Sequence, residues 1–220
     1  NSGCLEICLN MLASAERVGI NINDFLIACM DSDVFEALTR KGYSGAFLYM
    51  DQQLKEYQNW TFAQNSGFRN IVRHKWKVID RVHREHPHLM WVDTDIVFLK
   101  NPTKMLSGHK HVLFQTDLPG CTLLCTGFAV LNETAECRQL IAECGMDESE
   151  DDQLLMNRIA LTKYNEHVAV LSDDMFPNGN VFHRQSRKTN AIIVHNNWIT
   201  GVANKIAKFK EVGLWYLNNT

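Results

Sequence analysis

The chain has 220 residues, with 22 Lys and Arg against 25 Asp and Glu and a formal net charge of -3. Its residues are 45% hydrophobic and 21% charged, which is typical of an ordinary globular protein. The charge balance and the lack of a basic run argue against a nucleic-acid binder. No apolar stretch is long enough to span a bilayer and no signal peptide is visible, although a soluble fragment of a longer membrane-anchored protein would have the same composition.

The first part of the chain alternates predicted helices and strands. Apolar residues at helical spacing predict a helix over residues 5–19, and residues 24–30 follow as a buried strand. A helix over residues 32–41 then leads to a strand over residues 46–50. This alternation is typical of a parallel sheet with crossover helices. Such a sheet normally begins with a strand, so we expect a strand to precede Asn1.

A long amphipathic helix comes next. Residues 57–67 are polar and aromatic without a period, which predicts a loop, and residues 68–84 carry an apolar stripe at helical spacing. Basic residues crowd the other faces of this helix: Arg69, Arg73, Lys75, Lys77 and Arg81. We expect most of them to form a solvated face, and one or two are candidates for reaching a phosphate.

Two aspartates interrupt an apolar stretch over residues 89–99. The flanking residues predict a strand buried on both faces. Within one strand Asp93 and Asp95 would point to the same side, while Thr94 would point away. Buried carboxylates need compensation, and a pair on one face suits a hard divalent ion such as Mg²⁺ or Mn²⁺. The alternative is a strand end whose aspartates simply face water.

The rest of the chain also reads as alternating elements within one domain over residues 1–220, because no repeat or linker is visible. The predicted strands cover residues 112–115, 127–131, 168–171 and 191–194, and the predicted helices cover residues 103–106, 133–144, 153–161 and 202–212. Turns are expected at residues 120–126 and 175–179. Acidic residues suit a helix N-terminus, so Asp151 and Asp152 could be caps.

A histidine directly follows the last predicted strand. In open α/β sheets, ligands bind beyond the carboxyl ends of the strands, so His195 and Asp95 could reach one crevice. An imidazole added to two carboxylates gives a mixed ligand set that suits Mn²⁺. The alternative is a histidine with a purely structural role.

The cysteines and glycosylation sequons leave the cellular location open. None of the seven cysteines forms a Cys-x-x-Cys pair, which argues against a zinc ribbon and predicts buried free thiols. Sequons at Asn59, Asn132 and Asn218 would be glycosylation acceptors in a secretory lumen. The sequons allow a Golgi lumen, and the unpaired thiols allow a cytoplasm.

Five short motifs occur in a fixed order, at residues 91–99, 126–128, 152–153, 176–179 and 195–198. In this order they resemble the nucleotide-diphosphosugar transferases of the glycosyltransferase-A fold, in particular the family-77-like group. The resemblance covers nearly the whole chain. It implies a single-domain α/β fold with a Rossmann-like, mixed and mostly parallel sheet flanked by helices.

The resemblance also implies roles for the matching residues. Asp93, Asp95 and His195 would hold Mn²⁺ or Mg²⁺ on the donor diphosphate. Asp152 and Gln153 would be the catalytic residues at the sugar and the acceptor. The donor-binding candidates are Asn1 near the nucleotide base, Lys75 and Lys205 at the diphosphate or sugar, Asp93, Thr94, Gly201, and Gly127, which would permit close approach of the backbone.

The implied function is metal-dependent transfer of a hexosyl or pentosyl group from a nucleotide-diphosphate sugar to a glycan or glycoprotein acceptor. UDP is the expected nucleotide, and retention of the anomeric configuration is expected. One alternative is a metal-dependent phosphohydrolase, in which Asp173 and Asp174 would supply a further acidic cluster. The other is a non-catalytic module that binds a nucleotide sugar or a glycan.

Overall fold

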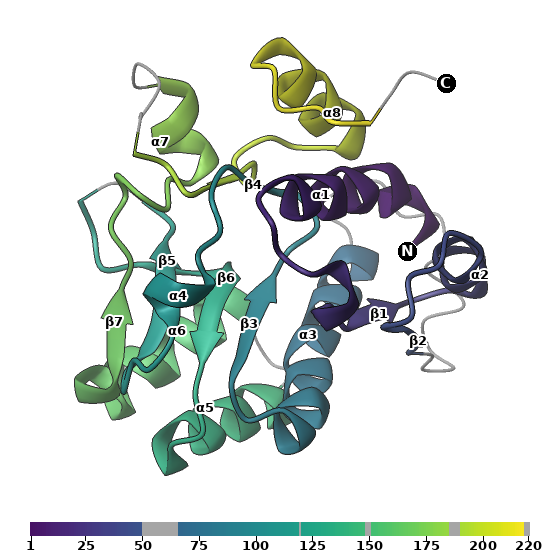
Figure 1. The fold of residues 1–220 in the computed structure, drawn as a ribbon. Helices are drawn as coiled ribbons and strands as arrows, with labels where there is room; N and C mark the ends of the chain where they lie inside the picture. Colours follow the sequence, from purple (N-terminus) through teal and green to yellow (C-terminus); the bar gives the residue numbers. More distant parts are fainter. Residues whose placement is uncertain (50–65, 119, 148–150, 185–189, 218–220) are drawn as a thin grey trace.

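The strands that the structure describes form one larger sheet and two smaller ones, flanked by helices (Figure 1). The computed structural model describes residues 1–49, 66–118, 120–147, 151–184 and 190–217, with the backbone alone at residues 66–71 and 73. The central sheet has the order β3-β6-β5-β7, and the two-stranded sheets are β1-β2 and β4-β8. The strands are β1 (Ile27–Cys29), β2 (Ala46–Leu48), β3 (Leu89–Val92), β4 (Ile96–Phe98), β5 (Val112–Thr116), β6 (Leu124–Leu131), β7 (Val168–Val170) and β8 (Ile193–His195).

The predicted α/β class with a mixed sheet and flanking helices is confirmed, but the prediction of mostly parallel pairing is wrong for the described strands. Pairs β1-β2 and β5-β7 are parallel, whereas β3-β6, β5-β6 and β4-β8 are antiparallel. Strands β5 and β6 are buried along almost their whole length. A strand covered on both faces is apolar on both sides whatever its direction, so the sequence pattern could not distinguish the two kinds of pairing.

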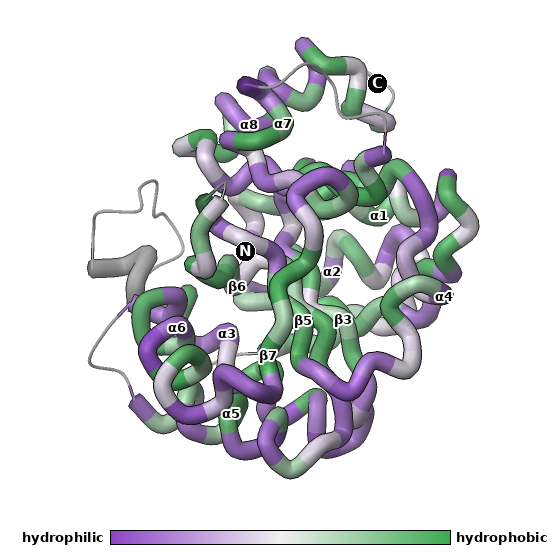
Figure 2. The backbone as a smooth tube through the Cα atoms, turned by 90° about the vertical axis from the view of Figure 1, so that its left-hand side faces the viewer, coloured by the Kyte–Doolittle hydropathy of each residue, from purple (hydrophilic) through white to green (hydrophobic). Residues whose placement is uncertain are grey.

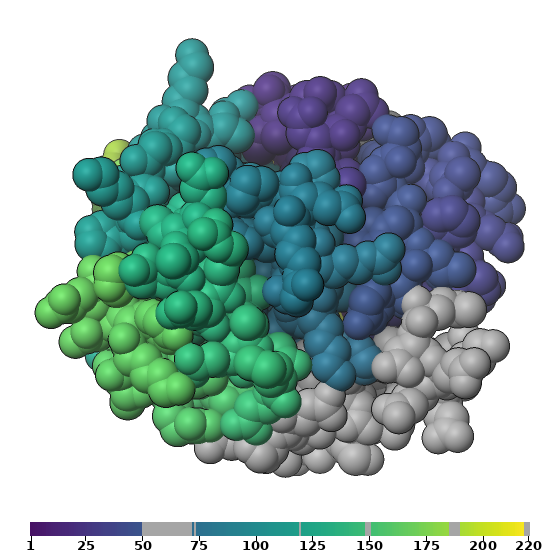
Figure 3. Space-filling model, turned by 90° about the horizontal axis from the view of Figure 1, so that it is seen from below, coloured from purple at the N-terminus to yellow at the C-terminus, as the bar shows by residue number. Residues whose placement is uncertain are grey.

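The described helices begin and end within a few residues of the predicted ones, except that α7 was not predicted. They are α1 (Leu5–Arg17), α2 (Ser32–Arg40), α3 (Ser66–Glu85), α4 (Thr103–Leu106), α5 (Ala135–Met146), α6 (Asp152–Lys163), α7 (Gly179–Arg184) and α8 (Val202–Glu211), with short 3₁₀ turns at Ser2–Cys4, Ile22–Asp24 and Asn165–His167. Figure 3 shows the segment around α3 lying between the N-terminal segment and the segment of α5 and α6. None of the helices that the structure describes is long and apolar enough to cross a membrane.

The central sheet separates two apolar cores. Phe114 and Ala129 pack with α3, α5 and α6 on one face, whereas their neighbours Leu113 and Phe128 pack with α1, α2 and β4 on the other. Successive side chains of a strand point to opposite faces, which explains why both cores draw on the same strands. Figure 2 accordingly shows hydrophobic colouring along β3 and β5.

The predicted strand over residues 89–99 is in fact divided, so the expectation that Asp93 and Asp95 lie on one face of a single strand is wrong. Strand β3 ends at Val92 and β4 begins at Ile96, and the three residues between them form a turn in which the Ile96 amide donates to the Asp93 carbonyl at 3.3 Å. The two strands then join different sheets. The polar triplet therefore lies where the chain crosses from one sheet to another, which spares both ladders a buried carboxylate.

Several predictions fall partly or wholly outside the described residues. These are the loop over residues 57–67, apart from the start of α3, and the sequons at Asn59 and Asn218. The asparagine of the remaining sequon, Asn132, is 5% exposed, and its side-chain amide donates to the Lys110 carbonyl at 2.8 Å. In the folded chain the Asn132 side chain is therefore hydrogen-bonded to the segment just before β5 and does not face solvent.

The prediction of buried free thiols is largely confirmed. All seven cysteines are free, and five of them are buried. Cys4 is partly buried and Cys121 is exposed. The prediction of a single domain over residues 1–220 stays a prediction.

Candidate metal and donor site

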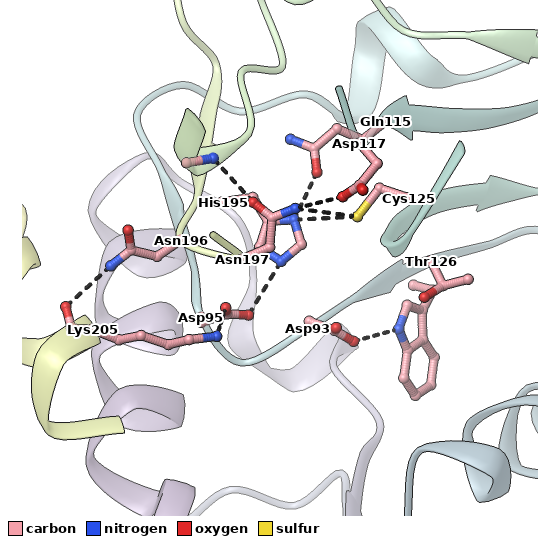
Figure 4. Close-up of polar contacts among 12 residues, drawn as sticks. Asp93, Asp95, Gln115, Asp117, Cys125, Thr126, His195, Asn196, Asn197 and Lys205 are labelled. Atoms are coloured by element: carbon pink, nitrogen blue, oxygen red, sulfur yellow. Dashed lines mark hydrogen bonds and ion pairs between the residues drawn. The ribbon is translucent and has the colours of Figure 1, made fainter. Parts of the chain in front are cut away.

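The candidate site lies where the turn between β3 and β4 meets the end of β8. Asp93, Asp95 and His195 each offer one ligand atom, and these atoms all lie within 4.8 Å of one another. The Nε2 atom of His195 is 3.3 Å from Oδ1 of Asp95 (Figure 4). The structure therefore brings together the three residues that the sequence singled out as metal ligands. Two carboxylate oxygens and one imidazole nitrogen form a ligand set that suits Mn²⁺ or Mg²⁺.

Gly127 on β6 makes room for this cluster. A Cβ atom at Gly127 would lie 2.2 Å from Cε1 of His195, which is closer than real atoms approach, and 3.0 Å from Oδ2 of Asp93, which is a tight contact. Its carbonyl also accepts a hydrogen bond from the Asp93 amide at 2.8 Å. The sequence prediction had assigned this glycine to close approach of a donor or acceptor. In the structure the space that it leaves is used by the candidate ligands themselves.

Asp95 lies between two positively charged partners. Lys205 of α8 is 2.5 Å from its Oδ2 atom, and His195 faces its Oδ1 atom. Burial works to raise the pKa of Asp95, but Lys205 and His195 outweigh it and hold that pKa well below its usual range. Burial works to lower the pKa of His195, and the Asp95 carboxylate outweighs it, so the pKa of His195 is raised to about 10.

Asp93 belongs to a cluster in which two carboxylates, those of Asp93 and Asp152, surround one cation, Lys75 of α3. The Lys75 ammonium is 3.2 Å from Oδ2 of Asp93 and 3.6 Å from Oδ2 of Asp152, and it donates to Oγ1 of Thr126 at 3.3 Å. Burial opposes the charge of Lys75, but the two carboxylates outweigh it and raise its pKa. The indole nitrogen of Trp91 donates to Oδ1 of Asp93 at 2.9 Å. Lys75 is therefore a buried cation that joins α3, the β3–β4 turn and the start of α6.

The two aspartates at the start of α6 have different roles. Asp151 is the cap, because its Oδ1 atom accepts from the Gln153 amide at 3.1 Å. Asp152 is buried and accepts from the Thr126 hydroxyl at 3.1 Å, while Oε1 of Gln153 accepts from the Thr126 amide at 3.2 Å. Burial raises the pKa of Asp152, and Lys75 partly offsets this. The structure therefore brings both catalytic candidates against β6, beside the cluster.

The remaining predicted residues lie in the β3–β4 turn, before α8 and at the start of the chain. Thr94 is in the turn between the aspartates, and Gly201 precedes α8 with a φ of 86°, a left-handed conformation that favours glycine. Asn1 starts the 3₁₀ turn that leads to Cys4. Burial raises the pKa of Cys4, which also senses the charges of the N-terminus and of Asp95.

Sequence reasoning missed several polar side chains around His195, which lie together in Figure 4. Gln115 Oε1 is 2.7 Å from Nδ1 of His195, and Cys125 Sγ is 3.8 Å from the same nitrogen. Oδ1 of Asp117 accepts from the side-chain amide of Asn197 at 3.1 Å. Burial raises the pKa of Asp117, and a side-chain hydrogen bond with Gln153 partly offsets this. The available signal was that polar residues follow the apolar part of a buried strand.

Asp173 and Asp174 are not part of this cluster. The group of described residues that could hold a metal ion contains neither of them. Asp174 is exposed, and its Oδ2 atom accepts from the side-chain amide of Asn190 at 3.0 Å. The further acidic cluster that a phosphohydrolase would require is therefore not assembled by these two residues.

Known proteins of similar sequence are sugar transferases. The UDP-galactose:fucoside alpha-3-galactosyltransferase of Dictyostelium discoideum is 23% identical over 275 aligned residues, covering 100% of this chain and 42% of the relative. The UDP-D-xylose:L-fucose alpha-1,3-D-xylosyltransferase 1 of Arabidopsis thaliana is 25% identical over 190 residues, covering 70% of this chain and 52% of the relative. The chain therefore spans about half the length of these relatives.

Solved structures with the same fold are also glycosyltransferases. An active-site mutant of LgtC superposes with a TM-score of 0.57 at 12% identity, covering 96% of this chain and 92% of that one. A glycosyltransferase involved in glycosylation of the major capsid of PBCV-1 superposes with a TM-score of 0.52 at 9% identity, covering 90% of each chain. At such low identity these likenesses show the fold alone, and they confirm the predicted glycosyltransferase-A architecture.

The family follows from the sequence itself. A sequence model described as nucleotide-diphospho-sugar transferase matches residues 20–209, which include the β3–β4 turn, the start of α6 and His195. This match extends over most of the chain and confirms the resemblance drawn from the short motifs. The chain belongs to the nucleotide-diphospho-sugar transferase family.

Proposed function

We propose that this chain carries the catalytic site of a metal-dependent glycosyltransferase that moves a hexosyl or pentosyl group from a UDP-sugar to a glycan, with retention of the anomeric configuration. The observation that carries the proposal is the meeting of Asp93, Asp95 and His195, whose ligand atoms lie within 4.8 Å of one another. Family membership and the named activities of the relatives support the same reaction class.

The residues present fit a divalent ion. The space left by the missing Gly127 side chain keeps His195 and Asp93 close together, and both carboxylates are anchored by other side chains. Asp93, Asp95 and His195 would hold the ion. When bound, Mn²⁺ or Mg²⁺ supplies Lewis-acid stabilisation of the negative charge that grows on the departing diphosphate.

The protein's own side chains then bind and orient the donor and the acceptor. Lys205 lies on Asp95 with its side chain 21% exposed, so its charge is available to an anion bound there. Thr126 fixes both Asp152 and Gln153 through hydrogen bonds. Asp152 would stabilise the positive charge that develops on the sugar ring. In a front-face route the departing phosphate oxygen takes the proton of the acceptor hydroxyl, so Asp152 positions the substrates and removes no proton.

The acceptor that we propose is a fucose-bearing glycan. The relatives named above act on a fucoside or on L-fucose, and both names specify an alpha linkage. These names support UDP-galactose or UDP-xylose as the first donors to test. They also support the expectation of an α-linked product.

The test is a transfer assay with UDP-galactose, UDP-xylose and GDP-sugars, supplied with Mn²⁺ and an L-fucoside acceptor. We expect transfer from a UDP-sugar to the fucoside, with an α linkage by NMR. Phosphate release from a phosphomonoester without transfer would support a phosphohydrolase instead. Binding of UDP-sugars with neither transfer nor hydrolysis of the donor would support a non-catalytic binding module.

The decisive variant is Asp95→Ala. We expect it to lower Mn²⁺-dependent transfer by about a hundredfold or more, the scale of losing one electrostatic stabiliser of a transition state. Asp174→Ala is the matched control, because Asp174 is an exposed aspartate outside the cluster. Circular dichroism should show that both variants fold. Full activity of Asp95→Ala would contradict the proposal.

A further inference from the structure

One buried hydrogen bond connects His195 to a residue outside the family-like motifs. The Oε1 atom of Gln115 lies 2.7 Å from Nδ1 of His195, on the side of the imidazole ring away from Asp95 (Figure 4). Gln115 has no exposed surface, and His195 is 2% exposed. The register between β5 and β6 shifts between Phe114 and Gln115, so that Gln115 lies opposite Cys125. Such irregularities redirect a side chain, and here the redirected side chain is the one that reaches His195.

The orientation of the Gln115 amide is fixed by a second contact. Its Nε2 atom donates to the Phe176 carbonyl at 3.0 Å. A backbone carbonyl only accepts hydrogen bonds, so the nitrogen of the amide must face Phe176 and the oxygen must face His195. The reverse orientation would place two oxygens against each other. Phe176 cannot easily move away, because it is fully buried and its own amide donates to the Ser172 carbonyl at 2.8 Å.

The fixed amide determines which nitrogen of His195 carries the proton. The Gln115 oxygen can only accept, so Nδ1 of His195 must donate to it. Binding of a metal ion requires the neutral imidazole, so the ion must displace the proton from one ring nitrogen. With the remaining proton held on Nδ1, the lone pair lies on Nε2. The Nε2 atom is the one that faces Asp95 at 3.3 Å. Metal-bound histidines commonly use a buried acceptor on the second nitrogen in this way.

We propose that Gln115 is the positioning residue that fixes His195 with Nδ1 protonated and Nε2 directed at the two aspartates, and that it thereby sets the affinity for the divalent ion. This inference rests on the proposed metal-dependent function. Cys125 also lies near Nδ1, at 3.8 Å, but a thiol both donates and accepts and so specifies neither form of the ring.

The test measures Mn²⁺ affinity by electron paramagnetic resonance, in the absence of any sugar nucleotide. Gln115→Leu removes the acceptor, and we expect the affinity to fall about ten- to a hundredfold. Gln115→Glu keeps an oxygen facing Nδ1 but loses the donor to the Phe176 carbonyl, so its affinity should be higher than that of Gln115→Leu.

Asn10→Leu is the matched control. Asn10 is another fully buried amide with two hydrogen bonds, to the Leu214 carbonyl and from the Tyr216 amide, and neither partner belongs to the metal cluster. We expect Asn10→Leu to lower stability towards urea as Gln115→Leu does, while leaving Mn²⁺ affinity unchanged. Equal losses of affinity in Gln115→Leu and Asn10→Leu would show a general effect of destabilisation and overturn the inference.

A spectroscopic measurement separates this inference from the proposed function. With Mg²⁺ bound, ¹⁵N NMR of His195 should show the proton on Nδ1 in the parent protein, and a proton on Nε2 there would overturn the inference even if no variant folded. Parent-like Mn²⁺ affinity of Gln115→Leu, in a protein where Asp95→Ala abolishes binding, would overturn the role of Gln115 alone. Equal binding by the parent and Asp95→Ala would overturn the metal site itself.

Discussion

Asp93 and Asp95 are two residues apart, yet their surroundings carry opposite charge balances. Around Asp93, one ammonium, that of Lys75, faces two carboxylates, those of Asp93 and Asp152. Around Asp95, one carboxylate faces two cationic groups, those of Lys205 and His195. Burial acts to raise the pKa of both Asp152 and Asp95. The two cationic partners outweigh it at Asp95 and lower that pKa, whereas the single cation Lys75 does not outweigh it at Asp152, whose pKa is raised.

The contrast indicates that the two regions favour ligands of opposite charge. The Asp93 region has an excess of negative charge, and the Asp93 side chain is 30% exposed, so it favours an incoming cation. Without an ion, the Asp95 region has an excess of positive charge. When an ion displaces the Nε2 proton of His195, Lys205 remains as the cation that favours the oxygens of a diphosphate. A metal ion and a nucleotide diphosphate would therefore each meet complementary charge on adjacent sides of one turn.

Removing Lys75 should have the largest effect on stability. Lys75→Met leaves the buried carboxylate of Asp152 and the partly exposed carboxylate of Asp93 without their cation. Breaking a buried ion pair in this way costs about 3–5 kcal/mol of unfolding free energy. Urea denaturation measures the loss. Lys163→Met is the control, because the pair between Lys163 and Glu143 is largely exposed and should contribute less than about 1 kcal/mol. Similar losses in both variants would remove the distinction between the two kinds of pair.

Adding one carbon at Gly127 should disturb both regions at once. The new Cβ of Gly127→Ala would displace His195 and Asp93, and a displacement of about 1 Å can lower a rate by about a hundredfold. Transfer and Mn²⁺ affinity are the measurements. Gly145→Ala in helix α5 is the control, since its Cβ would come no closer than 3.8 Å to the neighbouring Trp76 carbonyl oxygen. This substitution should stabilise the helix by about 0.5–1 kcal/mol. Normal metal binding by Gly127→Ala would mean that the two side chains can shift without loss.

Removing Lys205 should affect cation and anion binding in opposite directions. Without the ammonium on Asp95, Mn²⁺ alone should bind about tenfold more tightly, the value of one charge-assisted hydrogen bond. In the presence of Mn²⁺, UDP should bind more weakly. Calorimetry measures both affinities in Lys205→Ala, with Lys208→Ala, which removes the partner of Glu211, as the control on the same helix. A fall in both affinities would contradict the assigned surplus of positive charge.

The smallest effect is expected from the cap of α6. Asp151→Ala removes the cap and should cost about 1 kcal/mol of unfolding free energy, as should Thr134→Ala, which removes the cap of α5. Thermal unfolding checks the stabilities and the transfer assay checks activity. Only Asp151→Ala should lower turnover, because Asp152 and Gln153 begin the helix that it caps. Equal turnover in the two variants would show that the start of α6 tolerates fraying.

The sequence was sufficient for features that depend on neighbouring residues. The choice of Asp93, Asp95 and His195 as candidate oxygen and nitrogen ligands beside apolar strands could be read directly from the chain, and the structure brings the three residues together. The distinct roles of Asp151 and Asp152 could not, because both suit a helix N-terminus and only the contact with Lys75 distinguishes them. Burial and charge pairing are set by tertiary packing, so the contrast between the two regions was invisible in the pattern.

Features that depend on strand pairing were missed. The division between β3 and β4 results from pairing with β6 and β8 respectively. An apolar pattern that resumes after two aspartates contains no sign that the pairing partner changes. Thr126 was expected in a turn but lies within β6, which is extended by pairing with β5. Gln115 reaches His195 only because the register shifts beside it. Each of these outcomes depends on residues distant in the sequence.

The turn at Thr94 has a mechanical consequence. Asp93 continues the path of β3 in the central sheet, whereas Asp95 leads into β4 and His195 ends β8 in a separate sheet. An ion bound by all three residues would fasten the two sheets together across the point where the chain changes direction. Amide hydrogen exchange in β3 and in β8 should then slow together when the ion binds, because opening either strand would require releasing the ion.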